Sequence, residues 1–233
     1  MIYLNYYNVS NIKNYEYTQL KELVSKERRE RAERCYRMED AIRCIFAELL
    51  LRYSFHNHYT RMLNMDIYYN KHGKPYICSN EKFYYNLSHS GDWVVIVYGD
   101  VEVGVDVEKT NENYNLIYDS CFTNVEMQWI DKADKASKAQ RMAMVWTMKE
   151  AYLKYIGTGL FKSMHSFSMD MENGAILDDT GEIVRNVYTH CFSISKNYVC
   201  SVCSSEVQVC ESEVSEMEMQ SFLKKGNMVF GTP

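Results

Sequence analysis

The 233-residue sequence contains few of the residues that interrupt regular structure, only two prolines and ten glycines. This scarcity leaves little room for a flexible linker or a low-complexity tail. The first seven residues show no basic segment followed by a long apolar run, and no stretch reaches the roughly 18 apolar residues of a membrane span. We therefore expect a cytoplasmic globular protein with no export signal and no membrane partner.

The chain also has no large excess of either sign of charge. The formal net charge is −5 at pH 7, which argues against nucleic acid as a partner. A hydrophobic share of 46% and a charged share of 24% are typical of a globular protein, and the length suits one large domain or two small ones. We expect the chain to act as a monomer.

The eight cysteines, in a chain without an export signal, are expected to be reduced thiols. Cys200 and Cys203 have the spacing of a zinc-binding pair, and Cys191 and Cys210 lie near them in the sequence. However, residues 198–202 form a strand-like run, and no second closely spaced pair of cysteines or histidines accompanies them. We favour buried strand cysteines over a zinc site.

Hydrophobic periodicity predicts a mixture of helices and strands. Helices are expected over residues 18–26, 39–53 and 138–156, and after the capping box Thr123-x-x-Glu126. Strands are expected over residues 2–8, 83–87, 93–98, 101–107, 165–171, 187–193 and 198–202, and a turn over 70–75. Because turn signals separate the strands between residues 83 and 107, we expect an antiparallel meander there.

The two halves of the sequence echo each other. Residues 87–94 align with residues 192–199, and each segment forms an expected turn between two strands that follow a long helix. A duplicated unit explains the repeat, so the predicted fold class is α+β, with two similar subdomains packed about a pseudo-twofold axis. Each would have an antiparallel sheet and one long helix. We divide the chain into residues 1–102 and 103–233, and interfaces between domains favour small-molecule sites.

Three acidic residues are placed where one metal ion could hold them. Asp106 and Glu108 alternate with valines in an expected strand, which puts both on the same face. Glu150 and Lys154 lie one turn apart on the expected long helix. Three carboxylates form an all-oxygen set that suits Mg²⁺. The plainer interpretation is the solvated face of an edge strand and a helical ion pair, and each motif alone favours it.

Further motifs in the same chain shift this balance. The set comprises the Arg-rich stretch 26–34, Glu39-Asp40-Ala41-x-Arg43, Gly73-Lys74-Pro75, Asn86-Leu87-Ser88-His89-Ser90, Gly104-x-Asp106-x-Glu108 and Trp146-x-x-Lys149-Glu150-Ala151-x-x-Lys154. In order and spacing, this set resembles that of the Sfp-type 4′-phosphopantetheinyl transferases. The resemblance runs from about residue 1 to about residue 205. The two acidic motifs at this separation are specific, whereas the Gly-Lys-Pro turn alone is weak.

The resemblance implies transfer of 4′-phosphopantetheine from coenzyme A to a serine hydroxyl of an apo carrier protein, with release of 3′,5′-ADP. It implies Mg²⁺ as the cofactor, held by Asp106, Glu108 and Glu150. Because the serine of the carrier is the nucleophile, the enzyme needs only a base, and Glu150 or a water that it orients is the candidate. Lys154 and His89 complete the implied catalytic set by contacting the phosphates.

The resemblance also implies a set of coenzyme A contacts. They are Arg28, Arg31, Arg43, Lys74, Ser88, His89 and Lys154. Arg28 and Arg31 stand where family members often carry lysine, and arginine offers a bidentate fork to the 3′-phosphate. Neighbouring arginines in 26–34 could substitute for either, and alone this stretch would indicate a solvated helix face. Lys149 lies off the face of Glu150 and Lys154 and is expected to pair across to the other half.

A surface for the carrier protein is expected around Phe122, Met127 and Trp129, although these residues equally suit a core.

Two other functions account for part of the pattern. Another Mg²⁺-dependent phosphoryl or nucleotidyl transferase explains the acids but not the Ser-His and Gly-Lys-Pro turns. A non-catalytic module that binds coenzyme A or a carrier protein predicts the loss of a carboxylate or of Lys154, and all four are present. The tail beyond about residue 206 matches nothing in the family pattern.

Overall fold

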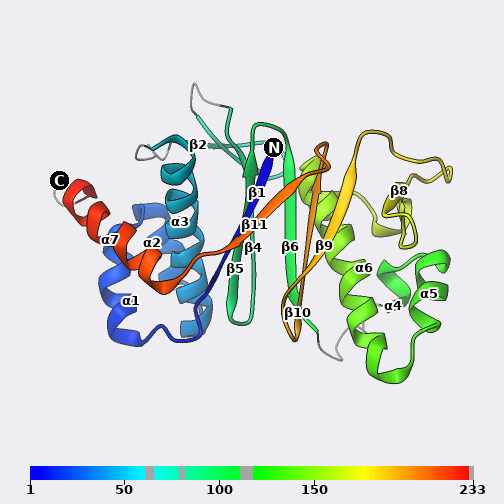
Figure 1. The fold of residues 1–233 in the computed structure, drawn as a ribbon, viewed down its shortest axis with the longest axis horizontal. Helices are drawn as coiled ribbons and strands as arrows, with labels where there is room; N and C mark the ends of the chain where they lie inside the picture. Colours follow the sequence, from blue (N-terminus) through cyan, green and yellow to red (C-terminus); the bar gives the residue numbers. More distant parts are fainter. Residues whose placement is uncertain (61–65, 79–81, 111–117, 231–233) are drawn as a thin grey trace.

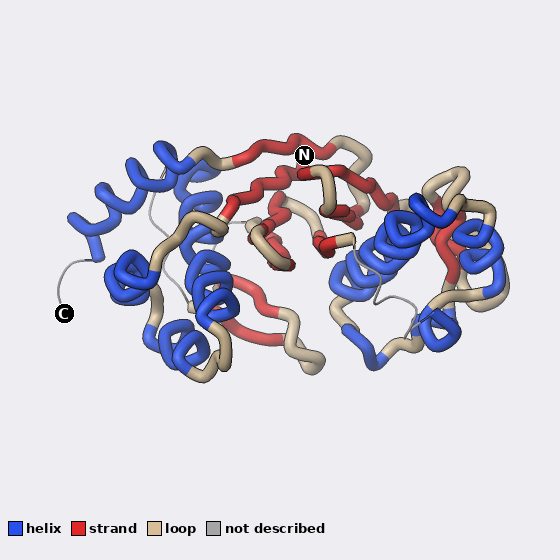
Figure 2. The backbone as a smooth tube through the Cα atoms, turned by 90° about the horizontal axis from the view of Figure 1, so that it is seen from below, coloured by secondary structure: helices blue, strands red, loops and turns tan. Residues whose placement is uncertain are grey.

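The computed structural model describes residues 1–60, 66–78, 82–110 and 118–230, and its two larger sheets lie in the middle of the molecule between two groups of helices (Figure 1). One group holds the helices of residues 14–59 together with the C-terminal helix of residues 216–230, and the other holds the helices of residues 118–156 (Figure 1). The view from below shows the same two groups on either side of the strands (Figure 2). No helix in the described ranges is both long and apolar enough to cross a membrane.

The first half is built around one long buried helix. Its elements are β1 (Ile2–Asn8), α1 (Asn14–Leu20), a 3₁₀ turn (Lys21–Leu23), α2 (Lys26–Glu33), α3 (Met38–Tyr59), β2 (Ile67–Tyr69), β3 (Pro75–Ile77), β4 (Tyr84–Ser90) and β5 (Trp93–Gly99). Helix α3 buries Ile45, Phe46 and Leu49 in a core shared with Val94 and Ile96 of β5. The helical spacing that predicts this element therefore marks the face that packs against the sheet.

The second half is also built around one long helix. Its elements are β6 (Val103–Lys109), α4 (Tyr118–Cys121), α5 (Asn124–Asp131), α6 (Lys135–Ile156), β7 (Ser168–Asp170), β8 (Ala175–Leu177), β9 (Tyr188–Ser195), β10 (Tyr198–Ser204), β11 (Val209–Glu213) and α7 (Glu216–Phe230). The expected capping box is present at the start of α5, where the backbone N–H of Thr123 donates to the Glu126 carboxylate over 2.7 Å. The predicted helix over 138–156 corresponds to α6.

The strand order repeats between the halves. One sheet has the order β11-β1-β5-β4, and the other has the order β6-β10-β9. In each half a first strand leads to a long helix and then to a hairpin, and the second strand of that hairpin pairs antiparallel with the first strand. The predicted α+β class with antiparallel sheets is confirmed, and the repeated order fits a duplicated unit.

The predicted meander is wrong at its last strand. β4 and β5 pair as expected, but β6 starts the second sheet instead of continuing the first. The reason is that β1 pairs with β5 along its whole length, from Ile2 opposite Gly99 to Asn8 opposite Trp93, while β4 occupies the other edge. No edge of β5 is left for β6, which lies beside β4 instead.

Two other expected elements differ from the structure. The helix predicted over 18–26 is divided between α1 and α2, because Ser25 caps α2 by accepting a hydrogen bond from the N–H of Arg28. The Arg-rich stretch therefore forms a helix of its own. The strand predicted over 165–171 is reduced to the three residues of β7, because residues 164–166 form a 3₁₀ turn.

The C-terminal tail returns to the first half. β11 pairs parallel with β1, and α7 places Phe222 edge-on against Tyr53 of α3, with ring centroids 5.7 Å apart. The boundary at 102/103 coincides with the start of β6 and stays our proposal for dividing the chain. Residues 209–225, which this boundary assigns to the second part, pack on the first half, and residues 231–233 lie outside the described ranges.

Helix α6 lies directly on β6, and Gly104 is what permits the contact. A Cβ atom at this position would overlap the carbonyl oxygen of Ala151 and the backbone nitrogen of Tyr155. This close approach brings the face of α6 that carries Glu150 and Lys154 next to Asp106, two residues along β6 from the glycine.

Candidate active site at the junction of the two sheets

Polar side chains of β4 bridge the gap between the two sheets. Asn86 accepts a hydrogen bond from the backbone N–H of Val105 over 3.0 Å, and Ser90 accepts one from the N–H of Lys109 over 3.2 Å. These side chains lie on one face of β4 because they are an even number of residues apart. They replace the backbone ladder that a regular sheet would have at this position.

Asp106 is the most enclosed acid of the junction, with only 4% of its surface exposed. Its Oδ1 atom accepts hydrogen bonds from the Ser88 hydroxyl over 2.8 Å and from the Lys154 ammonium over 2.6 Å. Lys154 also donates to the Ser88 hydroxyl over 3.1 Å. The other oxygen, Oδ2, is buried with no hydrogen-bond partner, so half of this carboxylate is left for a ligand.

The other two acids of the junction, Glu108 and Glu150, lie in surroundings that disfavour their charged forms. Loss of water, and then the negative charge of Asp106, raise the pKa of Glu108 to about 7, although Ser90 and Lys154 act in the opposite direction. The same two causes raise the pKa of Glu150, against the charge of Lys154. One ammonium group therefore does not balance three carboxylates, and a further cation would be favourable.

The donor set fits a divalent cation by its chemistry. In the parts of the chain that the structure describes, no three His, Cys, Asp or Glu side chains already converge as a metal-binding group. Asp106 nevertheless has a buried oxygen without a hydrogen-bond partner, and burial and then the charge of Asp106 raise the pKa values of Glu108 and Glu150. Three carboxylates are hard oxygen ligands, as Mg²⁺ prefers. The metal assignment of these residues stays a prediction.

Basic groups from both halves of the chain gather around His89 of β4. Partial burial lowers the pKa of His89, and the positive charges of Arg43, Lys154 and Arg31 lower it further. Arg43 is held in place by a 2.6 Å hydrogen bond to the carbonyl of Gly91 and by an ion pair with Asp40. The cluster therefore presents positive potential around a neutral imidazole, which suits the binding of an anion.

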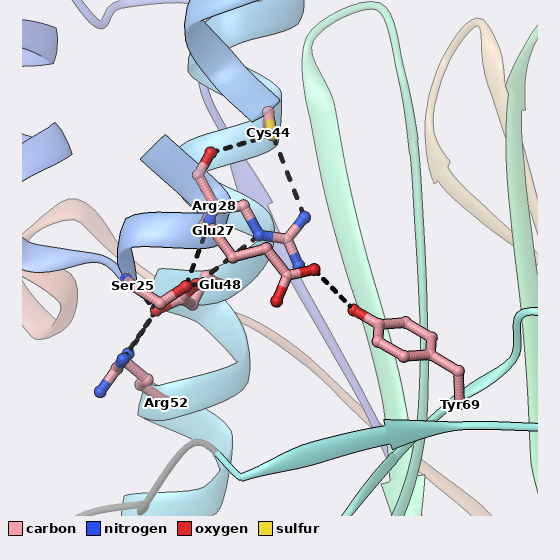
Figure 3. Close-up of polar contacts among 7 residues, drawn as sticks. All are labelled: Ser25, Glu27, Arg28, Cys44, Glu48, Arg52 and Tyr69. Atoms are coloured by element: carbon pink, nitrogen blue, oxygen red, sulfur yellow. Dashed lines mark hydrogen bonds and ion pairs between the residues drawn. The ribbon is translucent and has the colours of Figure 1, made fainter. Parts of the chain in front are cut away.

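Arg28 belongs to a buried network on the first half (Figure 3). At its centre Glu48, with 1% of its surface exposed, accepts hydrogen bonds of 2.7 Å from both the N–H and the hydroxyl of Ser25. Arg52 donates to the same carboxylate over 2.7 and 2.9 Å, and the Arg28 guanidinium lies 3.6 Å away. Glu48 thus fixes both the start of α2 and the arginine expected to bind phosphate.

Glu48 is a residue that the sequence analysis missed. The signal was available, because Glu48 and Arg52 are one helical turn apart and interrupt the apolar run of α3. Buried charges are rarely found unless they are paired, so such an interruption indicates an internal ion pair.

Lys74 lies at the junction, but its ammonium group is occupied. It donates to the Glu102 carboxylate over 2.6 Å and to the carbonyls of Val103 and Tyr155 over 3.0 and 2.9 Å. Because an ammonium has three hydrogens, all of its donors are used. The side chain holds the start of β6 and the end of α6 against the 70–75 turn. It also lines a hollow of about 190 Å³ that reaches Lys154.

Two expectations for the second half are wrong. Lys149 does not pair with the first half, because its fully buried ammonium donates to Glu126 over 2.6 Å and to the carbonyl of Phe167 over 2.8 Å. Phe122 has 0% of its surface exposed and forms part of the core, so it does not contribute to an exposed docking surface. Met127 and Trp129 are half-buried against the same core.

The cysteines of β10 are strand residues, as predicted. Cys200 and Cys203 are both buried with free thiols, whereas Cys191 and Cys210 are exposed. Among the described residues, no group of three His, Cys, Asp or Glu side chains forms a zinc site around them. The thiols of the β10 pair pack in two different hydrophobic clusters.

Two family models match the chain, one on each half. The 4′-phosphopantetheinyl transferase superfamily matches residues 102–203, and the N-terminal model of 4′-phosphopantetheinyl transferase matches residues 11–99.

Three curated relatives are similar over most of the chain. The 4′-phosphopantetheinyl transferase psf-1 of Bacillus pumilus is 30% identical over 194 residues, which cover 76% of this chain and 81% of the relative. The transferase Sfp of Bacillus subtilis (strain 168) is 28% identical over 173 residues, covering 73% and 77%. The transferase gsp of Aneurinibacillus migulanus is 27% identical over 188 residues, covering 78% and 77%.

Proposed function

The chain belongs to the 4′-phosphopantetheinyl transferase superfamily and is an enzyme of that type, and we propose that it uses coenzyme A as donor and a carrier protein as acceptor. In the proposed reaction, the 4′-phosphopantetheine group moves to a serine hydroxyl of an apo carrier protein. The reaction depends on Mg²⁺ and releases 3′,5′-ADP. Family membership favours this reaction over another Mg²⁺-dependent transferase and over a non-catalytic binding module.

The observation that carries the proposal is the meeting of acids and bases at one junction. Lys154 donates to Asp106 while its charge also acts on Glu108, Glu150 and His89. Acids suited to a cation thus lie next to bases suited to phosphate. A pyrophosphate with its metal ion needs both kinds of group on adjacent sides.

The basic side of the junction would bind coenzyme A. His89, Arg43 and Arg31 would provide positive potential for its phosphates, and Lys154 would reach the pyrophosphate from α6. Arg28 would contribute a guanidinium already held by Glu48, so little rotational freedom would be lost on binding.

Lys74 and Ser88 complete the proposed coenzyme A set. The ammonium of Lys74 is occupied by three acceptors. Lys74 would therefore contact coenzyme A as part of the wall of the hollow that it lines. Ser88 lies beside Lys154 and would be close to the same phosphate oxygens.

The acidic side would hold the cofactor. Asp106, Glu108 and Glu150 would be the protein ligands of Mg²⁺, which when bound would neutralise charge on the phosphate oxygens. Asp106 would use its unpartnered Oδ2, because Oδ1 is occupied by Ser88 and Lys154.

Glu150 would also handle the proton of the reaction. The serine oxygen of the carrier forms a bond to the β-phosphorus of coenzyme A, and the bond from that phosphorus to the bridging oxygen breaks to release 3′,5′-ADP. The serine proton passes to the Glu150 carboxylate, directly or through a water, and then to solvent. In the metal-free protein, burial and then the charge of Asp106 raise the pKa of Glu150, so its carboxylate accepts a proton more readily than an ordinary glutamate.

The proposal is tested by measuring the intact mass of carrier proteins. A panel of apo carriers from fatty acid, polyketide and nonribosomal peptide synthesis is incubated with the protein, coenzyme A and Mg²⁺. At least one carrier is expected to gain a single phosphopantetheine group, and chelation of Mg²⁺ is expected to abolish the gain. If no carrier in the panel gains this mass, the proposed reaction is wrong.

A further inference from the structure

Ser90 ends β4 directly opposite Glu108, and the functional assignments above give it no task. Its hydroxyl lies 2.8 Å from Oε2 of Glu108 and 3.2 Å from the backbone nitrogen of Lys109. Both partners belong to β6, so this one side chain contacts a proposed metal ligand and the backbone next to it. The contact crosses from one sheet to the other.

The direction of each hydrogen bond follows from the chemistry of the groups. The backbone N–H of Lys109 can only donate a hydrogen bond, so the Ser90 oxygen must accept it. The single O–H of the serine is then left to donate to the Glu108 carboxylate. The Lys109 bond therefore fixes the rotation of the hydroxyl, and the hydroxyl fixes one oxygen of Glu108.

Ser88 repeats this arrangement two residues earlier. Its oxygen accepts from the Lys154 ammonium over 3.1 Å, which leaves its single O–H for Oδ1 of Asp106 at 2.8 Å. Ser88 and Ser90 share one face of β4, and Asp106 and Glu108 share one face of β6. Two neighbouring hydroxyls thus hold one oxygen of each of two neighbouring carboxylates.

We propose that Ser90 is a positioning residue, which turns the Glu108 carboxylate toward the metal that Asp106 and Glu150 share with it. The inference rests on the proposed function, because it needs a Mg²⁺ ion at these acids. Groups that hydrogen-bond to a ligand set its orientation, and their loss costs about 10- to 100-fold in metal affinity or activity. By the same geometry, the hydroxyl of Ser88 would orient Asp106 and leave its unpartnered Oδ2 for the ion.

The second half provides a matched control for Ser90. In the repeated hairpin, Ser193 of β9 donates to the carbonyl of Ser195 over 3.2 Å and is exposed. It is a strand serine with a hydrogen-bonded hydroxyl but with no carboxylate as its partner. Substitution there changes the same chemical group without touching the junction.

The test compares Ser90→Thr, which keeps the hydroxyl, with Ser90→Val. The valine side chain has the shape of threonine but carries a methyl group in place of the hydroxyl. Mg²⁺ binding is measured by titration calorimetry in the presence of coenzyme A and without carrier protein. We expect Ser90→Val to weaken Mg²⁺ binding by about 10- to 100-fold, and Ser90→Thr and Ser193→Val to bind as the wild type does. The Mg²⁺ concentration that half-saturates transfer should rise in parallel for Ser90→Val only.

Thermal unfolding of each variant checks the fold, and Ser90→Ala replaces Ser90→Val if the added methyl groups prevent folding. Mg²⁺ binding by the hydroxyl-free variant that equals the wild type would overturn the inference and leave the proposed reaction intact. Equal loss in Ser90→Thr and Ser90→Val would also overturn it, because the hydroxyl would then not be the cause. A wild-type protein that neither binds Mg²⁺ nor transfers phosphopantetheine would overturn both proposals.

Discussion

The first strands of the two halves occupy equivalent places and carry different chemistry. The repeated hairpins are 105 residues apart, so Ile96 of β5 corresponds to Ser201 of β10. Asn5 lies opposite Ile96 in β1, and Asp106 lies opposite Ser201 in β6. Asn5 is thus the counterpart of Asp106, and Tyr7 is that of Glu108.

The counterparts show what turns a structural strand into a site. Asn5 donates to Ser54 and Tyr98 inside the first half, and Tyr7 stacks on Phe46 in its core. The equivalent positions of β6 lie instead at the edge that meets β4, where side chains of the other half can reach them. The antiparallel pairing of the first strand with the hairpin is the same in both halves. The carboxylates occur only in the first strand that lies at the junction, β6.

Asp106→Asn, which makes β6 resemble β1 at this position, should have the largest effect on activity. The amide loses the charge that pairs with Lys154 and that would bind Mg²⁺. Transfer rates to a carrier protein should fall by at least about 100-fold, since even indirect disturbance of a metal ligand costs up to that much. Initial rates at saturating Mg²⁺ measure the change. A rate within threefold of the wild type would remove Asp106 from the site.

The reciprocal change, Asn5→Asp, should destabilise the protein without creating a site. Asn5 is buried, and its partners are the neutral hydroxyls Ser54 and Tyr98. An uncompensated buried charge costs about 3 kcal/mol of the free energy of unfolding. Urea denaturation at pH 7 measures the loss, with Asn8→Asp at the half-buried end of β1 as a control. Unchanged stability would show that the two strands differ less than we infer.

Gly104→Ala should damage the second half through packing. The counterpart of Gly104 in β1 is Tyr3, which stacks on Tyr98, whereas a Cβ at Gly104 overlaps the backbone of α6. Overpacking of this kind costs about 2 kcal/mol, and the shift of α6 should also lower transfer activity. Urea denaturation and rates are measured together. Gly181→Ala serves as a comparison for backbone strain alone, because φ at Gly181 is +84° but an added Cβ there meets no atom within 4 Å. It should lose stability without losing transfer activity. Full activity and stability in Gly104→Ala would contradict the close approach of α6.

Stability should also depend on pH through Glu108. The folded protein raises the pKa of this carboxyl to about 7 from 4.5, so between these pH values the folded state binds more protons than the unfolded state. Stability without Mg²⁺ should therefore fall as pH rises from 4.5 to about 7. Glu108→Gln should flatten this part of the curve, and Mg²⁺ should stabilise the wild type more at pH 8 than at pH 5. Thermal unfolding midpoints across this range provide the measurement, and a variant curve parallel to the wild type would contradict the assignment.

The sequence predicts well what depends on local spacing. Valines alternate with Asp106 and Glu108, and this period of two residues places both acids on one face of the strand. The helical period places Glu150 one turn before Lys154. The structure brings these acids, Lys154, Ser88 and His89 to one junction. The repeat of the two hairpins likewise indicates the duplicated α+β arrangement.

What the sequence does not predict is the choice of partner across long distances. β6 leaves the meander because β1, almost a hundred residues away, already occupies the edge of β5. Lys149 finds Glu126 rather than a residue of the other half, and the Lys74 ammonium is satisfied by two carbonyls that no residue pattern reveals. Ser90 is within a recognised motif, but its task depends on β6 lying beside it.

Anomalous diffraction from crystals grown with Mn²⁺ and coenzyme A would test the central claim most directly. The account predicts one strong peak bound by oxygens of Asp106, Glu108 and Glu150, next to the pyrophosphate and close to Lys154. It also predicts that the peak is lost in Asp106→Asn while coenzyme A remains. A peak bound by other residues, in crystals of protein that transfers phosphopantetheine, would contradict the placement of the active site at the junction of the two sheets.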